Sequence, residues 1–427
     1  MRVREQFTLI TITLFAAITR FWNLATPKGY VFDEVYYVDG AKDYLKYGVE
    51  VDKTSPEFIV HPPIGKWMIS IGIKLFGDNE FGWRFMGALL GTLSIALIYL
   101  IAKQLFNSIF LATSAAAMMA LDGLHLVLSR TALLDIYLMF FVLLAFFTFI
   151  REKYWWTGIT LGLAIGAKWS GIYYLLTLLA IALFFEIKNR KVNKILKRIT
   201  QLFFIPSLIY IFSWSGWIFS KRGWDRQWAD ERGGLFSFIP APIRSLWHYH
   251  AEMLNFHTGL IEAHSYSANP WSWLILGRPT SFYYQSPNTC GSSSCAQEVV
   301  ALGTPLLWWL GTAALFVTFG YFVSRREKLA GLILAGIAAG YLPWFFFQKR
   351  TVFSFYAVVF EPFLILALIY CFAKLLEDPL TYKARKTALI GLHVAVALCF
   401  LYFFPVFVAT ITTYDDWHAR MWFNSWI

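Results

Sequence analysis

The sequence predicts an all-α protein that crosses a membrane many times, and three observations lead to this fold class. The chain has 427 residues, of which 58% are hydrophobic and only 15% are charged. Apolar runs of roughly 20 residues, the length that a membrane-spanning helix needs, recur along the chain. Most of the basic residues lie in the breaks between these runs. A disordered chain, a collagen and a disulfide-framework protein are excluded by this composition.

Eleven apolar runs are predicted to span the membrane. Gly166, Lys168 and Gly171 interrupt the stretch 154–187, which is therefore interpreted as two short helices joined by a turn. An odd number of spans places the two termini on opposite sides. The predicted spans are 6–24, 84–105, 109–129, 132–150, 154–168, 170–187, 200–219, 305–323, 329–347, 353–374 and 388–411.

The net charge of +11 does not indicate nucleic-acid binding, because the basic residues are scattered over many loops. Their distribution among the loops instead predicts which side of the membrane each loop faces. The N-terminus and the short loops after spans four, six, eight and ten are rich in Lys and Arg, and such segments stay in the cytoplasm. We therefore expect a multi-pass protein of the cell membrane. Its N-terminus would be cytoplasmic, and its C-terminus would lie on the outer face.

Two outer segments are too long to be simple connectors, and long loops in compact proteins are usually functional. They divide the chain into a membrane module 1–219 with the outer loop 25–83, a second long outer loop 220–304, and a membrane module 305–427. Within the first loop, the amphipathic stretches 39–48 and 66–76 are expected to lie along the membrane surface.

Ionisable residues cluster near the outer ends of the predicted spans. One such residue alone is equally compatible with a side chain that reaches back to the interface. Together they predict a polar chamber that opens on the outer face, where several cations would favour a phosphate. The residues are Arg20, Arg84, Asp122, His125, Arg130, Asp135, Lys168, Lys349 and Arg350.

The motif YVFDEVYY at 30–37 places two adjacent acids among large apolar residues. Such an acid is suited to act as a general base or to orient a hydroxyl. A solvated loop or a helix N-terminus, where acids are favoured, also explains the dipeptide, and spacing alone favours this simpler interpretation. The stretch 61–85 adds His61, Lys66 and Arg84, which indicates a loop that handles anions.

These segments and several others, in this order along the chain, resemble the protein O-mannosyltransferase family, enzymes of the GT-C fold that use polyprenyl-phosphate-mannose. The second outer loop is too short for the β-trefoil insertion of eukaryotic members, so the chain resembles the compact prokaryotic form. The matching motifs are FDEVYY (32–37), HPPIGKW (61–67), FGWRF (81–85), SRTALLDIYLMFF (129–141), LGLAIGAKWSG (161–171), NPWSWLILGRPTSFYY (269–284) and QKRTVFSFYAVVFEPF (348–363).

The resemblance implies an inverting glycosyltransferase that moves mannose from the lipid donor to Ser or Thr hydroxyls of secreted or membrane proteins on the outer face. It implies Asp33 as the general base, with Glu34 ordering the loop or contacting the acceptor or the sugar. Arg84 is the first candidate for the donor phosphate. Arg130, Lys168 and Arg350 are further candidates for the same anion.

Other residues have both a binding and a structural interpretation. His61 and Lys66 are expected either to contact the phosphate or the acceptor backbone or to anchor the loop. His257, His264 and Trp271 are expected either to contact the sugar or acceptor peptide or to anchor the loop at the interface.

Two acids and two cysteines are interpreted as structural. Asp135 is expected to pair with Arg130, and Glu361 with a cation such as Arg350 or Lys168. A disulfide between Cys290 and Cys295 is expected because their loop would face an oxidising compartment.

No metal is expected, because no cluster supplies the three or four ligands that zinc needs. The expected partners are the lipid-linked donor, membrane lipids and an acceptor polypeptide, which the enzyme would meet during translocation. Two alternatives remain. A related GT-C enzyme would act on a lipid or glycan acceptor. A transporter of lipid-linked sugar would usually show paired halves, and the sequence has no such symmetry.

Overall fold

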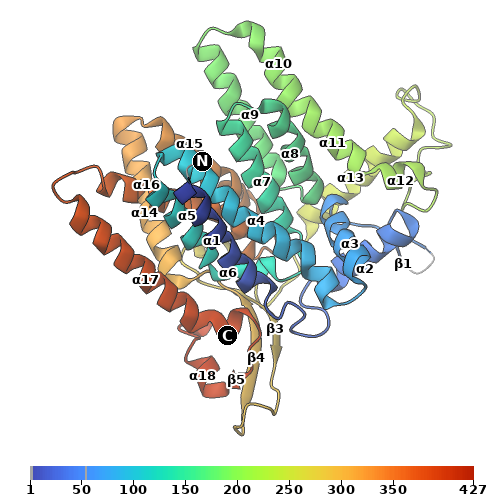
Figure 1. The fold of residues 1–427 in the computed structure, drawn as a ribbon. Coiled ribbons are helices and arrows are strands. Elements are labelled where there is room, and N and C mark those ends of the chain that lie inside the picture. Colours follow the sequence, from blue (N-terminus) through green and yellow to red (C-terminus); the bar gives the residue numbers. More distant parts are fainter. Residues whose placement is uncertain (1–2, 53–54) are drawn as a thin grey trace.

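The apolar runs of the sequence are helices in the structure, a computed structural model that describes residues 3–52 and 55–427 (Figure 1). The helices of the first module are α1 (Val3–Phe21), α4 (Glu80–Phe106), α5 (Ile109–Ala120), α6 (Gly123–Ser129), α7 (Asp135–Ile150), α8 (Tyr154–Ala167), α9 (Gly171–Lys188), α10 (Ile195–Ile199) and α11 (Ile205–Ser213). Those of the last module are α14 (Pro305–Arg325), α15 (Lys328–Tyr341), α16 (Glu361–Leu375), α17 (Tyr382–Phe407) and α18 (Tyr414–His418). The predicted all-α class is confirmed.

Both long loops are folded. The first contains α2 (Glu34–Tyr47), a two-stranded pair of β1 (Val51–Asp52) and β2 (Ser55–Pro56), and α3 (Ile64–Phe76). The second follows α12 (Ser215–Phe219) and contains α13 (Ala241–Gly259) and the antiparallel strands β3 (Thr280–Gln285) and β4 (Cys295–Ala301). β5 (Thr412–Thr413), near the end of the chain, pairs with β4, so the sheet order is β3–β4–β5.

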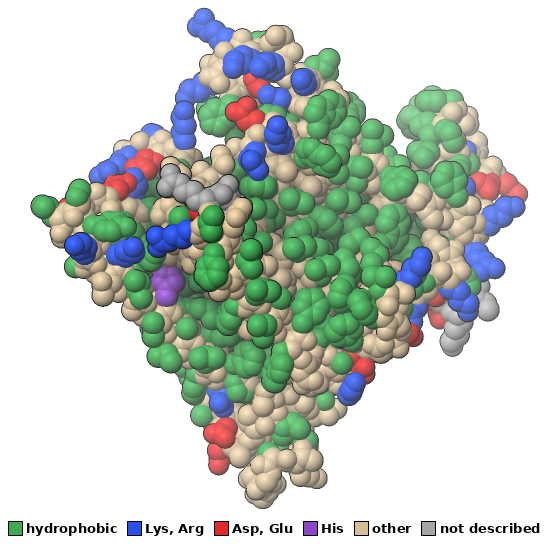
Figure 2. Space-filling model, viewed as in Figure 1, with side chains coloured by type: hydrophobic (Ala, Val, Ile, Leu, Met, Phe, Trp, Pro, Cys, Tyr) green, Lys and Arg blue, Asp and Glu red, His purple; other side chains and the backbone are tan. Residues whose placement is uncertain are grey.

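Among the described residues, six helices are long and apolar enough to cross a membrane, or seven if the bent pair α5–α6 is one span. The eleven predicted runs all coincide with helices, but their number as membrane crossings stays a prediction. Figure 2 shows a broad hydrophobic surface, with Lys and Arg gathered towards the end where α10 lies.

Two predicted spans are broken by residues that favour a helix start. α5 and α6 meet at 64°, because the Asp122 side chain accepts from the backbone N–H of His125 and begins a new helix. The run 353–374 starts as a 3₁₀ turn (Ser354–Val359), and α16 begins only at Glu361, with Pro362 in its first turn.

The first outer loop packs tightly onto the bundle through glycines. A Cβ on Gly72 of α3 would lie 2.2 Å from the carbonyl oxygen of Gly82 in α4. Only a residue without a side chain permits this approach of the two backbones. The contact fixes the first outer loop against α4.

Candidate active site

A cavity of about 580 Å³ lies between α8, α9, α11 and α13 and the segment after α15. Its long wall is apolar, and one end carries polar and charged side chains. The apolar wall includes Ile172, Leu175, Leu176, Phe203, Pro206 and Ile211. The polar end includes His61, Lys168, Tyr173, His257 and Arg350.

Lys168 marks the polar end of the cavity. It follows the last residue of α8, where LGLAIGAKWSG turns into α9. Its Nζ lies 2.9 and 3.0 Å from the two carboxylate oxygens of Asp135, and 4.0 Å from the centroid of the Tyr356 ring. The expected pairing of Asp135 with Arg130 is therefore wrong, because α7 turns Asp135 towards α8 instead.

Arg350 and two histidines complete this end. The Arg350 guanidinium donates to Nδ1 of His257 at 3.2 Å, and Nε2 of His257 donates to the carbonyl of Val60 at 2.7 Å. Burial, with a smaller contribution from Arg350, lowers the pKa of His257 to about 4, so this ring is neutral at pH 7. The His61 ring lies 5.4 Å from the His257 ring, and burial holds the pKa of His61 well below its usual range.

Unused polar atoms remain at this end. Nε of Arg350 and Nδ1 of His61 are buried and have no hydrogen-bond partner within the described residues. Buried polar atoms are usually satisfied, and exceptions deserve a functional explanation. An anion and its neighbouring hydroxyls would supply such partners.

Asp33 lies behind this end of the cavity, directly before α2. Its Oδ2 accepts from the Tyr37 hydroxyl at 3.5 Å, and the Tyr37 ring lies 5.9 Å from the ring of His61. Burial raises the pKa of Asp33 to about 6, while the charge of Lys168 opposes this rise and that of Asp135 adds to it. Asp33 is therefore ionised at pH 7 but is a stronger base than an ordinary aspartate.

The residue before Asp33 has an unusual backbone. Phe32 has φ of 50°, a conformation that costs a bulky residue free energy and marks functional turns. Its ring stacks on Phe282 at 4.8 Å and lies 5.7 Å from each of the rings of Phe353 and Phe355. Three motifs that are far apart in sequence thus meet here and hold the turn that aims Asp33.

Glu34 and Arg84 form a closed network away from the cavity. Both side chains are fully buried, and Nε and one terminal nitrogen of Arg84 each donate to Glu34 at 2.8 Å. Glu34 also accepts from the backbone N–H groups of Val31 and Ala132. The remaining donors of Arg84 go to carbonyls of the loop 24–29.

This network assigns Glu34 and Arg84 to the shape of the loop. Every N–H of Arg84 has a protein acceptor, so none is available to a phosphate in this structure. The expected contact of Arg84 with the donor is not supported by the geometry. The alternative in which Glu34 orders the loop agrees with it.

Arg130 also has a structural position. Its guanidinium donates to the backbone carbonyls of Thr19, Arg20, Trp22 and Asn23, and so covers the C-terminal end of α1. A cation at this end of a helix also interacts favourably with the helix dipole. The expected phosphate contact of Arg130 is therefore not supported either.

Of the candidates for acceptor binding, only His61 and His257 line the cavity. Lys66, in α3, is buried in an ion pair with Glu50. His264 packs edge-on against Phe353, 4.9 Å away, next to Phe32. Trp271 is 70% exposed and donates to Gln348.

A second buried polar cluster lies deeper in the bundle. Arg20 donates to His125 at 2.8 Å, and His125 contacts Ser94 at 2.9 Å. Asp122 accepts from the backbone of Thr304 and from Trp308, which ties α6 to α14. The predicted single chamber is therefore divided into separate clusters.

Glu361 belongs to this inner region rather than to the cavity. Neither of its oxygens has a hydrogen-bond partner in the part of the chain that the structure describes. The charged groups that interact with it are Asp122 and Arg20. The expected partners, Arg350 or Lys168, are wrong.

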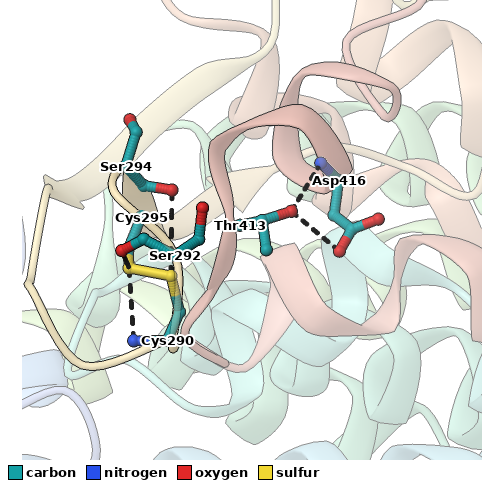
Figure 3. Close-up of a disulfide and its surroundings, with 6 residues drawn as sticks. All are labelled: Cys290, Ser292, Ser294, Cys295, Thr413 and Asp416. Carbon is teal, nitrogen blue, oxygen red and sulfur yellow. Dashed lines mark hydrogen bonds between the residues drawn. A yellow bond between two sulfur atoms is a disulfide. The ribbon is translucent and has the colours of Figure 1, made fainter.

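The disulfide is present. Figure 3 shows Cys290 and Cys295 joined at the end of the β3–β4 hairpin. The neighbouring Ser294 carbonyl accepts from the backbone of Tyr414, and the Thr413 hydroxyl bonds to Asp416. The disulfide therefore braces the contact between the hairpin and the C-terminal segment.

Sequence reasoning missed Tyr37 and the role of Phe32. Tyr37 lies four residues after Asp33, a spacing that puts both on one face of a helix, so this partner could have been found. The backbone of Phe32 leaves no signal in a single sequence. Within residues 3–52 and 55–427 there is no group of three or more metal-type side chains.

Two family models match the chain. One, described as dolichyl-phosphate-mannose-protein mannosyltransferase, covers residues 10–215. The other, the C-terminal four-span region of protein O-mannosyltransferase, covers 242–426. Together they include the residues that line the cavity, Asp33, the first long loop and the second from residue 242 onwards.

Curated relatives match along nearly their whole length. A polyprenol-phosphate-mannose–protein mannosyltransferase of Mycobacterium tuberculosis (strain ATCC 25618 / H37Rv) is 33% identical over 100% of this chain and 92% of its own length. The protein of the same description from Corynebacterium glutamicum is 30% identical over 99% and 94%.

Solved structures share the fold. The Saccharomyces cerevisiae protein O-mannosyltransferase Pmt1–Pmt2 complex bound to the sugar donor matches with a TM-score of 0.82 and 17% identity, over 100% of this chain and 93% of that one. ArnT from Cupriavidus metallidurans bound to undecaprenyl phosphate matches with a TM-score of 0.56 and 15% identity, over 92% and 70%. On the full-length relatives and the two family models, the chain belongs to the protein O-mannosyltransferase family.

Proposed function

We propose that this protein transfers mannose from a polyprenyl-phosphate-mannose donor to Ser or Thr hydroxyls of polypeptides on the outer face of the membrane. The observation that carries the proposal is the cavity, whose apolar wall leads to a cationic end next to the half-buried carboxylate of Asp33. Relatives named for this activity, matched over their full length, support it.

The cavity suits a lipid phosphate. The side chains of α9 and α11 that line it would contact the first part of a polyprenyl chain. Arg350 and His61 bring buried polar atoms that have no hydrogen-bond partner among the described residues, and Lys168 adds a positive charge. A guanidinium can hold two phosphate oxygens at once. Arg350 is therefore our first choice for the phosphate, in place of Arg84.

Asp33 would act as the general base in a single displacement. The carboxylate takes the proton of the acceptor hydroxyl, whose oxygen bonds to the anomeric carbon of mannose. The bond between that carbon and the phosphate oxygen breaks, and its electron pair leaves with polyprenyl phosphate. Attack opposite the leaving group inverts the anomeric centre. Cations that stabilise the departing phosphate make a separate acid unnecessary.

The location on the outer face rests on the Lys- and Arg-rich short loops, which the positive-inside rule places in the cytoplasm. Asp33 and the cavity's polar end then lie with the two long loops on the opposite side. Acceptors would reach Asp33 from that side, in an extended state before or during folding.

The test is a transfer assay with the full chain in proteoliposomes. Polyprenyl-phosphate-[³H]mannose is supplied with a Ser/Thr-containing peptide, and the control peptide has Ala at those positions. Label in the first peptide only supports the proposal. Label that appears instead in a lipid product, separated from the donor by chromatography, would favour the alternative, a transferase with a lipid acceptor, and contradict the proposal.

A further inference from the structure

The second outer loop, together with Phe219 directly before it, presents a set of large apolar side chains that no described residue covers. Four of them are between 79% and 86% exposed, namely Phe219, Leu235, Phe238 and Trp247. Figure 1 shows the segment between α12 and α13 as a protrusion at the edge of the molecule, and Figure 2 shows hydrophobic side chains gathered on it. We define the apolar rim as Phe219, Leu235, Phe236, Phe238, Ile243, Trp247 and Leu254.

The backbone beneath these side chains is held in place from α13. The Arg244 guanidinium donates to the carbonyls of Ile239 at 3.1 Å, Arg232 at 2.6 Å and Ala229 at 3.0 Å. The hydroxyl of Ser245 accepts from the N–H of Ala229 at 3.0 Å. Two neighbouring residues of one helix thus fix both ends of the loop 229–239, whose apolar side chains project outwards from an ordered base.

α13 itself is apolar on opposite faces. Ile243, Trp247 and Leu254 follow at steps of four and seven, so they share one exposed face. The opposite face is buried, where Tyr249 packs against Trp214 with 5.1 Å between the ring centroids. A helix that is apolar on both faces is suited to a buried position rather than to water.

The position of the apolar rim in the chain indicates that its side chains contact the lipid bilayer. The helix Val192–Ser213 is one of those able to cross a membrane, and Phe219 follows its end by six residues. The rim therefore begins at a membrane surface. At its other end, Leu254 belongs both to the rim and to the lining of the cavity, which residues of α9 and α11 also line.

Charge adds little to this attraction. Residues 221–232 contain four basic and three acidic side chains, a net charge of +1. Insertion would therefore be driven by apolar burial and would depend only weakly on anionic lipid. A protein partner that recognises charge finds no strong patch here.

We propose that the apolar rim inserts into the outer leaflet and keeps the mouth of the cavity immersed in lipid. Insertion follows from the exposed apolar surface and the neighbouring span alone. Only its consequence, access of a lipid-borne donor to the cavity, rests on the proposed function.

Insertion is tested by fluorescence quenching of the full chain in proteoliposomes. Cys371 and Cys399 are first replaced by Ala, so that the remaining native cysteines, Cys290 and Cys295, are both held in the disulfide and do not react with the label. A nitrobenzoxadiazole label is then attached at Phe238→Cys, or at Asp230→Cys as the polar control in the same loop. Nitroxide-labelled lipids should quench the label at 238 several-fold more strongly, in neutral and in anionic vesicles alike. Equal quenching at both positions, or strong quenching at 238 by aqueous iodide, overturns the proposal.

The consequence for donor access is tested separately. Phe238→Ser with Trp247→Ser should raise the apparent KM for the polyprenyl donor several-fold in proteoliposomes and leave it unchanged in detergent. The control, Phe238→Leu with Trp247→Leu, should behave as the unmodified chain. If the Ser and the Leu double variants have equal KM values for the donor in proteoliposomes, the apolar rim does not affect donor access to the cavity. Absence of transfer by the unmodified chain counts against the proposed function, whereas the quenching result stands on its own.

Discussion

Replacement of Glu34 by Gln should destabilise the protein rather than remove a catalytic group. The carboxylate accepts four hydrogen bonds at 2.8–2.9 Å, two from Arg84 and two from the backbone at Val31 and Ala132. Gln cannot accept all four, because one of its two positions is a donor. It also leaves the fully buried Arg84 charge without a counter-ion.

The size of the effect follows from burial. Breaking a buried ion pair by removing one partner costs about 3–5 kcal/mol. We therefore expect Glu34→Gln to lower the free energy of unfolding by about that amount, and to expose the loop 24–34 to protease. Lys28 in the same loop makes only an exposed pair with Glu80 at 3.4 Å. Lys28→Ala is thus a matched control, expected to cost less than about 1 kcal/mol.

The assay combines thermal unfolding in detergent with limited proteolysis of both variants and of the unmodified chain. A large loss of stability in Glu34→Gln, absent in Lys28→Ala, agrees with the network. If Glu34→Gln unfolds like the unmodified chain but transfers no mannose, Glu34 acts on the substrate and our structural assignment is refuted.

Three further predictions concern the cavity and its base. Arg350→Ala should lower kcat/KM for the donor by about tenfold or more, because a hydrogen bond to a charged group contributes about 1.5–3 kcal/mol. Lys349 is the neighbouring residue and is exposed, so Lys349→Ala should leave kcat/KM unchanged. Steady-state kinetics at varied donor concentration measure both effects. Leu176→Trp, on the apolar wall, should raise the KM for a long-chain donor more than for a short-chain one, and Phe184→Trp, exposed elsewhere on α9, should raise neither. Transfer should fall as the pH drops through about 6, because the raised pKa of Asp33 means that the base becomes protonated there; a rate that increases from pH 7 to pH 5 would exclude Asp33 as the base.

The helices could be predicted from the sequence because helix formation depends on residues that are close together along the chain. A long apolar run in a membrane can satisfy its backbone groups only as a helix, so all eleven runs coincide with helices. Their ends were less predictable where a side chain competes with the helix. Asp122 begins a second helix inside one run, and Pro362 delays the start of another.

The site was predictable in its residue types but not in its pairings. The limits of the apolar runs predicted that Arg84, Arg130 and Lys168 lie near the ends of spans, but not the direction in which each side chain points around its helix. That direction depends on helix packing over long sequence separations. Arg84 therefore lies against Glu34, 50 residues away, and Lys168 takes the partner that was expected for Arg130.

The central claim is that Asp33 removes the acceptor proton next to a lipid phosphate in the cavity. The most direct measurement compares Asp33→Asn with the unmodified chain for both donor binding and mannose transfer. The account predicts that transfer falls by about 10²–10⁴-fold, as for loss of a general base, while the Kd for the donor stays the same. Undiminished transfer by Asp33→Asn would contradict it.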